Sequence, residues 1–360
     1  MHNNSLIFQT PIKFVFIIIM ILLSACTATK PTIEVTCEPT PQATNTPTLT
    51  STPSPTKTPT QTPTPIPPGG EETPFKMAVY SNPIDPEALK ESAALSIFIT
   101  EQTGLAFQIE YYDTYTDMLN DLSDYSLHAA WLPPLTYIYA QENQLAEVNL
   151  LTNHFGSYLT GTQFIAPLAS GAKPYFNSEK NINSANAATA LRQFQGKQPC
   201  WVNFNSATGY IVPAGILAQN SIQIQPGAEL QSHSAVIRAL FAGEICDFGA
   251  TFSISGDPRT SSDLMTDFPN ILEEMPIIWR SDPIVPNLNL SYHPNISDEL
   301  RTQINLALFS YGSTLEGQQS LSTAIRYNIQ DLKFIESDIY DSLIDLIEIL
   351  GIDPADLIGG

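Results

Sequence analysis

The feature that most constrains the fold is a regular alternation of short apolar runs and amphipathic stretches that begins at Phe75. The run "FKMAVYS" predicts a strand, "PEALKESAALSIFITEQTG" a helix that starts at a proline and ends at Gly104, and "AFQIEYY" a second strand. A helix over 115–122, the strand "HAAWL" and a helix over 134–141 continue the pattern. Strands that alternate with helices favour an α/β fold with a parallel sheet and helices on its faces.

A second set of elements follows the extended stretch "YLTGTQFIAPL" at 158–168. It comprises a helix over 187–194, the strand "CWVNF", a helix over 209–219, and the helix "SAVIRALFAGE" leading into the strand "ICDFGATF". Two extended runs broken by prolines come after Pro276. Residues 297–350 are expected to be helical throughout, with "DIYDSLIDLIEILG" as an amphipathic closing helix.

Two α/β sets joined by two extended crossings, near 163–167 and 280–290, predict a two-lobed clamshell with an open mixed sheet in each lobe. The expected boundaries are 75–163 with 285–358 for lobe 1 and 164–284 for lobe 2. Open sheets of this kind bind ligands at the carboxyl ends of strands, beside helix N-termini. A binding cleft is therefore expected between the lobes.

The segments ahead of this body predict export followed by a tether. Lys13 precedes the apolar run 14–23, which is about half of the ~20 residues needed to span a bilayer, and "LSAC" follows. Residues 1–25 are expected to be a signal peptide, with a short transmembrane anchor or an ordinary secretory signal as the alternative. Residues 26–74 are expected to be a disordered tether, since the Thr/Pro/Ser stretch that begins at Cys37 cannot bury enough apolar surface to fold.

Charge and cysteine content narrow the function classes. The formal net charge is −21, which disfavours binding to nucleic acid or anionic lipid, and no basic run is present. In an oxidising compartment Cys200 and Cys246 are a disulfide candidate, and two buried free thiols are the alternative. No CxxC or HExxH-like spacing indicates a metal site.

Three strand ends are expected to face the cleft, at Ser81, at Trp131–Tyr137 and at Asn205–Tyr210. The last of these reads "NSATGY" and comes directly before a predicted helix. A helix start exposes N–H groups without intrahelical partners and carries about half a positive charge. Hydroxyls beside a glycine that permits close approach would therefore suit an oxyanion. The alternative is that the hydroxyls only cap the helix.

Other candidate residues each have a structural alternative. Trp131 and Tyr137 could stack on a ligand or close the core, and Asp247 could accept from a ligand or pair locally. Arg238 and Arg280 are cations near the predicted cleft, for which a surface position is favoured unless one points inward to pair with a phosphoryl group. The scattered histidines are expected to be solvated or hydrogen-bonded, namely His128, His154, His233 and His293.

The stretch "NSATGYIVP" resembles the Asn-Ser-Thr-Ser-Gly-(Phe/Tyr)-Leu-Val-Pro segment of the phosphonate-binding proteins that serve ABC importers. In the same order, "AAWLPPLTY", "SHSAVIRALFAGEICDFGA" and "IIWRSDPIVPNLNLSYHPNIS" resemble that family's Ala-Trp strand, its His-led helix with the following strand, and its return crossing. The resemblance covers about 75–335 and implies the type 2 periplasmic-binding-protein fold. The segment "LSAC" resembles the lipobox of bacterial lipoproteins, which implies a lipid on Cys26.

The resemblance also implies which residues hold a ligand. Ser206, Thr208 and the amides near Gly209 would bind the anionic oxygens from one lobe, with Thr136 and the Ser81 loop contributing from the other. The full expected set is Ser206, Thr208, Gly209, Tyr210, Thr136, Tyr137, Ser81, Trp131, His233 and Asp247. Ala207 replaces one hydroxyl of the family segment, and Ser234 stands where aminoalkylphosphonate binders place a glutamate. The latter argues against an aminoalkylphosphonate ligand.

The expected function is that of a lipid-anchored, extracytoplasmic solute-binding protein of an ABC importer. It would close around a small oxyanion of the phosphate, phosphite or phosphonate class and deliver it to a membrane permease. The chain is expected to be a monomer without a cofactor, attached to the membrane only through its lipid. An enzyme on the same clamshell is an alternative, but no nucleophile with a base and no metal cluster is evident. A sensory lipoprotein and a binder of another small metabolite are further alternatives.

Overall fold

The computed structural model describes residues 67–358. The predicted signal peptide, the lipidation site Cys26 and the tether up to residue 66 lie outside these residues. The last part of the predicted tether belongs to the folded body, because the Gly69 carbonyl accepts a hydrogen bond from the Ala106 N–H at 2.8 Å and the Gly69 N–H donates to the Thr73 carbonyl at 2.7 Å. The ordered body therefore begins slightly ahead of Phe75.

Lobe 1 is built on a six-stranded sheet with the strand order β14-β4-β13-β3-β1-β2. Its strands are β1 (Phe75–Tyr80), β2 (Phe107–Tyr112), β3 (Ala129–Leu132), β4 (Glu147–Asn153), β13 (Asn289–Tyr292) and β14 (Asp331–Phe334). The helices of this lobe are α1 (Pro86–Thr103), α2 (Tyr115–Ser123), α3 (Pro134–Glu142), α9 (Asp298–Tyr311) and α10 (Leu315–Ile325). The first three strands are mutually parallel and the last three run antiparallel to their neighbours.

Lobe 2 is built on a second six-stranded sheet with the order β11-β5-β10-β8-β9, to which β12 adds by pairing with β5. Its strands are β5 (Leu159–Ile165), β8 (Pro199–Trp201), β9 (Ala228–Glu229), β10 (Phe248–Ser253), β11 (Ile277–Arg280) and β12 (Val285–Pro286). A small hairpin lies beside it, made of β6 (Phe176–Asn177) and β7 (Ile182–Asn183). Its helical segments are η1 (Leu168–Ser170), α4 (Ala187–Ala190), η2 (Leu191–Phe194), η3 (Ala207–Ile211), α5 (Val212–Gln219), α6 (His233–Ala242), η4 (Pro258–Thr260), α7 (Ser262–Asp267) and α8 (Ile271–Glu274).

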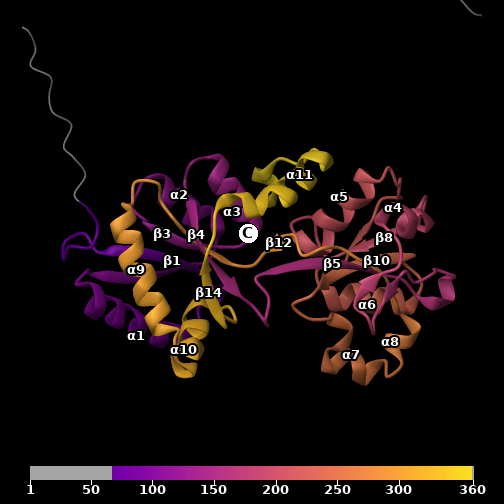
Figure 1. Cartoon of the computed structure of the whole chain (residues 1–360), viewed down its shortest axis with the longest axis horizontal. Helices are drawn as coiled ribbons and strands as arrows, with labels where there is room; N and C mark the ends of the chain where they lie inside the picture. Colours follow the sequence, from indigo (N-terminus) through magenta and orange to yellow (C-terminus); the bar gives the residue numbers. More distant parts are fainter. Residues whose placement is uncertain (1–66, 359–360) are drawn as a thin grey trace, which may run out of the picture. The chain divides into compact units, whose positions relative to one another are not determined.

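The predicted mixed sheets and two-lobed α/β fold are confirmed, and the two sets of elements are seen in Figure 1. The expectation of helix throughout 297–350 was wrong. Residues 331–334 form β14, which pairs with β4 at the edge of the first sheet. A strand of four residues leaves almost no periodicity to detect between two long helices. β4 itself was not predicted.

The crossings between the lobes lie nearer to lobe 1 than the sequence suggested. Residues 163–165 pair with β10 and β11 inside the second sheet, so the first crossing is the segment 154–158 between β4 and β5. The second crossing enters β13 through Asn287, whose side-chain amide donates to the carbonyls of Ser157 at 2.7 Å and Thr152 at 3.3 Å. Asn287 thus ties the two crossings together.

The predicted disulfide between Cys200 and Cys246 is confirmed, with the two Cα atoms 5.6 Å apart. Cys200 lies in β8, and Cys246 lies two residues ahead of β10, which runs parallel to β8. Both side chains belong to the apolar cluster between the second sheet and α6. The bridge therefore fixes the amino ends of two neighbouring strands.

The C-terminal segment, which holds the predicted amphipathic closing helix, contacts both lobes. This helix is α11 (Asp341–Leu350), preceded by η5 (Ser337–Tyr340) and followed by η6 (Pro354–Leu357). α11 packs on α5 of lobe 2, η6 packs on α3 of lobe 1, and Figure 1 shows α11 between α3 and α5. Within residues 67–358, no helix combines the length and apolar character that crossing a bilayer requires.

Candidate functional site

The predicted ligand segment forms the start of the helix that η3 and α5 make together. Ser206 is its N-cap: the Ser206 hydroxyl accepts from the Gly209 N–H at 3.0 Å, and the Ser206 carbonyl accepts from the N–H groups of Tyr210 and Ile211. The capping interpretation of Ser206 therefore describes what its side chain does in this structure.

Two backbone N–H groups at this helix start are free of partners within the described part of the chain. Those of Ala207 and Thr208 have no acceptor among the hydrogen bonds of the described residues. Thr208 is 8% exposed, and its carbonyl accepts from the Thr162 hydroxyl at 2.8 Å. The Thr208 hydroxyl has no partner in the described part of the chain, and it is not among the fully buried polar atoms that lack one. Two amides and one hydroxyl thus remain available to an anion at the positive end of a helix dipole.

Gly209 allows close packing at this helix start. A Cβ atom at this position would lie 2.4 Å from Val202 Cγ2 and 2.8 Å from the Ser206 hydroxyl oxygen. The glycine lets the helix start lie directly on the end of β8. The next residue, Tyr210, is half-buried with its ring edge-on to Phe204 and Trp201, at 4.8 and 5.8 Å between centroids.

In lobe 1, α3 offers a second helix start with free amides. Pro133 caps the helix without a side-chain hydrogen bond, and the N–H groups of Leu135 and Thr136 have no acceptor among the described residues. Thr136 is 2% exposed. Tyr137 is buried with its ring 4.4 Å from that of Tyr340, and burial raises its pKa to about 12. The structure thus places Tyr137 in the core.

Ser81 and Trp131 are also engaged inside lobe 1. Ser81 follows β1 and is 4% exposed; its hydroxyl donates to the Pro83 carbonyl at 3.1 Å and its N–H to the Tyr112 carbonyl at 2.8 Å. Trp131 is 1% exposed and packs in the apolar cluster that also holds residues of α1 and α9. The core alternative thus describes the position of Trp131.

His233 and Asp247 lie apart from each other in lobe 2. His233 begins α6, edge-on to Phe252 with ring centroids 4.9 Å apart, and burial lowers its pKa to about 4, so it is neutral at pH 7. Asp247 accepts from the Gln198 N–H at 2.8 Å and from the Lys197 ammonium at 3.3 Å. These contacts lie at the amino ends of β8 and β10, whereas Ser206 follows the carboxyl end of β8. The structure does not bring Asp247 to the predicted site, and the local-pairing alternative accounts for it.

Both candidate cations are occupied by partners from their own lobe. Arg238 pairs with Asp263 at 3.3 Å and with Asp267 at 2.5 Å on the exposed side of α6. Arg280 donates to the Asn181 amide oxygen at 2.7 Å and to the Gln163 amide oxygen at 3.2 Å. Its guanidinium also lies over the ring of Phe176, 4.3 Å from the centroid.

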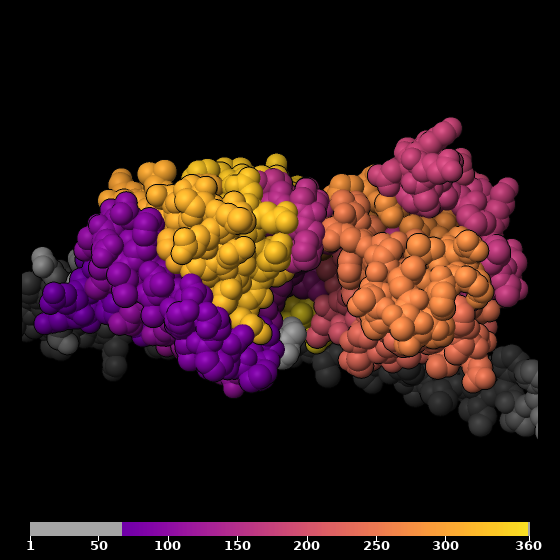
Figure 2. All heavy atoms as spheres, turned by 90° about the horizontal axis from the view of Figure 1, so that it is seen from below, coloured from indigo at the N-terminus to yellow at the C-terminus, as the bar shows by residue number. Residues whose placement is uncertain are grey.

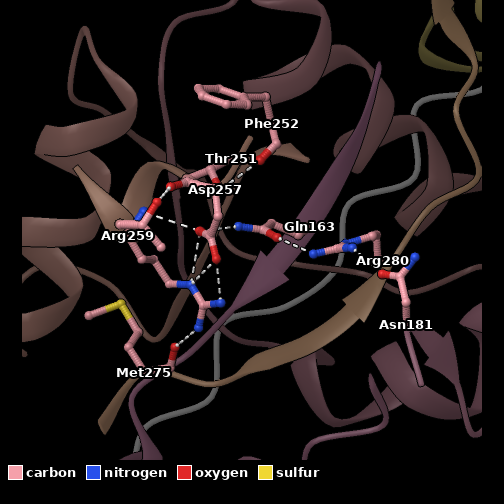
Figure 3. A network of polar contacts seen from close by, with 9 residues as sticks. Gln163, Asn181, Thr251, Phe252, Asp257, Arg259, Met275 and Arg280 are labelled. Carbon is pink, nitrogen blue, oxygen red and sulfur yellow. Dashed lines mark hydrogen bonds and ion pairs between the residues drawn. The ribbon is translucent and has the colours of Figure 1, made fainter. Parts of the chain in front are cut away.

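Figure 3 shows that Arg280 belongs to a longer polar network centred on Gln163. The Gln163 amide nitrogen donates to Asp257 at 2.9 Å, and Asp257 pairs with Arg259, which is 5% exposed. Burial raises the pKa of the Asp257 carboxyl, but the hydrogen bonds and charge of Arg259 outweigh it, so the pKa lies below the usual range. Arg259 was not predicted, and the available signal was an Asp-Pro-Arg turn after a strand.

The chemistry available at the two helix starts is therefore neutral hydrogen-bond donation. Within residues 67–358, no group of three or more His, Cys, Asp or Glu side chains is arranged to hold a metal ion.

In the space-filling view a groove separates the surface of lobe 1, indigo and yellow, from the orange surface of lobe 2 (Figure 2).

Comparison with known proteins agrees with this architecture. The family model for the periplasmic substrate-binding protein of phosphonate ABC transporters matches residues 83–338. A search of curated proteins found no match. Among solved structures, PhnD1 of Prochlorococcus marinus in complex with methylphosphonate is 13% identical with a TM-score of 0.52, and the match covers 77% of this chain and 98% of that one.

A second similar structure is XAC2383 of Xanthomonas citri, which was solved with chloride and with ATP. The chloride form is 14% identical with a TM-score of 0.57, covering 77% of this chain and 97% of that one. The ATP form is 13% identical with a TM-score of 0.56, covering 79% and 99%. At these identities the structures establish a shared fold.

Proposed function

Because this chain belongs to the family of periplasmic substrate-binding proteins of phosphonate ABC transporters, we propose that it captures a small oxyanion of the phosphate, phosphite or phosphonate class and delivers it to a membrane permease. As a member of this family it is an extracytoplasmic binding protein rather than an enzyme. The two lobes would close around the ligand by bending at the crossings, 154–158 and 287–288.

The observation that carries this proposal is the pair of free N–H groups at Ala207 and Thr208, together with the Thr208 hydroxyl. Three uncharged donors at the positive end of a helix suit the oxygens of a tetrahedral anion. The free amides of Leu135 and Thr136 at the start of α3 would supply donors from lobe 1. Methylphosphonate in the Prochlorococcus structure supports the same ligand class.

The test is calorimetric titration of the purified chain with phosphate, phosphite, methylphosphonate, ATP and sulfate. We expect binding of at least one of the first three ligands, and tighter binding of it than of sulfate. Binding of ATP alone would place the protein with nucleotide binders instead. A protein that binds none of the five would contradict the proposed ligand class, provided its thermal unfolding shows that it is folded.

We further propose that the chain is a monomer held at the membrane by a lipid on Cys26. The basis is the "LSAC" segment and the Thr/Pro-rich stretch after it. Expression in a bacterial host with a labelled fatty acid should mark the wild-type chain and leave Cys26→Ala unmarked. Equal label in the variant would rule out this anchor. Size-exclusion chromatography with light scattering measures the oligomeric state.

A further inference from the structure

The C-terminal segment 337–358 begins at the end of the matched family region, which stops at residue 338, and it contacts both lobes in turn. Tyr340 comes first: it is fully buried, with its ring 4.4 Å from Tyr137 of α3 in lobe 1. α11 then packs on α5 of lobe 2, and after Gly351 the chain turns so that η6 packs on α3 again. Leu357 of η6 is 3% exposed there.

The contact between α11 and α5 is apolar and close. The inward side chains Leu343, Leu346 and Ile347 are 0%, 4% and 2% exposed. Gly215 of α5 lies directly beneath Leu346, since a Cβ atom on this glycine would be 2.8 Å from Leu346 Cβ. The three inward side chains of α11 belong to one continuous buried cluster with Tyr137, Tyr340 and side chains of both lobes.

We propose that α11 is a strap that joins the lobes, in addition to the two crossings, and restrains their relative orientation. A helix that is anchored in lobe 1 at both ends and packed on lobe 2 in the middle resists any motion that separates α3 from α5. Motion between the lobes must move α11 along α5 or release it. A pocket of about 240 Å³, lined by Ile216, Asp282 and Leu346 among others, lies between α11, α5 and the loop that joins β11 to β12. The strap thus leaves unfilled space toward which it can shift.

The strap also contacts the proposed ligand helix. α11 packs on α5 and on η3, the turn that presents the free amides of Ala207 and Thr208. Its position therefore bears on the segment that we assign to the ligand, so this consequence rests on the proposed function. The restraint itself needs no ligand. An experiment on the ligand-free chain therefore tests the strap independently of the proposed ligand.

The experiment compares interlobe distances in the ligand-free full chain. The exposed residues Glu101 in lobe 1 and Glu244 in lobe 2 are each replaced by a noncanonical amino acid that carries the spin label. This labelling does not use thiols, so the disulfide stays intact. Gly215→Val introduces a side chain beneath Leu346, and Leu346→Ala removes the contact without adding bulk. The matched control is Ile349→Ala on the outward face of α11, where the side chain is 43% exposed.

We expect the distance distribution to broaden in Gly215→Val and Leu346→Ala and to stay as in the wild type in Ile349→Ala. If Gly215→Val fails to fold, Leu346→Ala decides alone. Distributions that are unchanged in the folded variants, or equally broadened in the control, would overturn the strap.

Discussion

The Thr208 hydroxyl offers a sharp test of the site, because the structure separates its role from that of its neighbour Ser206. Thr208→Val keeps the shape of the side chain and removes only the hydroxyl, which has no hydrogen-bond partner among the described residues. The Thr208 carbonyl, which accepts from Thr162, is unaffected. The variant should therefore fold with nearly the stability of the wild type.

The expected loss is in affinity. A hydrogen bond to a charged group contributes about 1.5–3 kcal/mol, and each 1.4 kcal/mol changes the dissociation constant tenfold. Thr208→Val should therefore weaken binding of the preferred oxyanion by about 10- to 100-fold. Calorimetric titration gives the affinity, and thermal unfolding without ligand gives the stability.

Ser206→Ala is the matched comparison. It removes the oxygen that accepts from the Gly209 N–H, so it should lower the stability by about 1 kcal/mol, which is roughly 2–4 °C in the melting temperature for a domain of this size. Its affinity should fall less than that of Thr208→Val. Unaltered affinity in Thr208→Val would refute the assignment, and so would a loss that scales with lowered stability in both variants.

Three further predictions concern stability. The Cys200–Cys246 bridge joins residues separated by 46 positions, so reducing it should lower the free energy of unfolding measured in urea by about 4 kcal/mol. An unchanged urea midpoint with both thiols alkylated would contradict this. Burial lowers the pKa of His128 from 6.5 to about 4, so below pH 6.5 the unfolded chain binds a proton that the folded chain does not. The free energy of unfolding should therefore decrease as the pH is lowered from 6.5 to 4, by up to about 1.4 kcal/mol per pH unit for this group. His128→Gln should flatten that slope in urea titrations between about pH 4 and 7. Gly209→Ala should lower the melting temperature more than Ser206→Ala, because the added Cβ atom would lie 2.4 Å from Val202 Cγ2. Equal melting temperatures would show that Val202 and the end of β8 can shift to make room for it.

The lobes could be predicted from the sequence because their helices and strands carry strong periodic patterns. The strand at Phe75 and the helix that starts at Pro86 and ends before Gly104 have clear signals in the sequence, and both are present. The disulfide followed from two cysteines at the start of neighbouring strands. What periodicity does not give is pairing, which is why β14 was missed: its four residues become a strand only through contact with β4, distant in sequence.

The site was harder to predict because side-chain roles depend on what each residue touches in three dimensions. Ser206 and Thr208 are two positions apart in one motif, yet one hydroxyl caps the helix and the other lacks a partner among residues 67–358. Asp247 has the chemistry of a ligand acceptor, but parallel pairing of β8 and β10 puts it at the opposite end of the sheet from Ser206. Sequence spacing alone cannot distinguish these cases.

Arg238, Arg259 and Arg280 of lobe 2 are engaged by other residues of that lobe, which explains why ligand recognition should rest on neutral donors. Arg259 is neutralised by Asp257, Arg238 by two aspartates, and Arg280 is held by amide oxygens and an aromatic ring. With each of these guanidinium groups engaged inside lobe 2, an anion at the start of η3 would meet backbone dipoles and a hydroxyl instead of a free charge. Such donors are fixed in direction by the helix, so they can fit the tetrahedral arrangement of oxygens without a formal ion pair that salt would screen. A strongly acidic protein can in this way bind an oxyanion through local dipoles despite its net charge of −21.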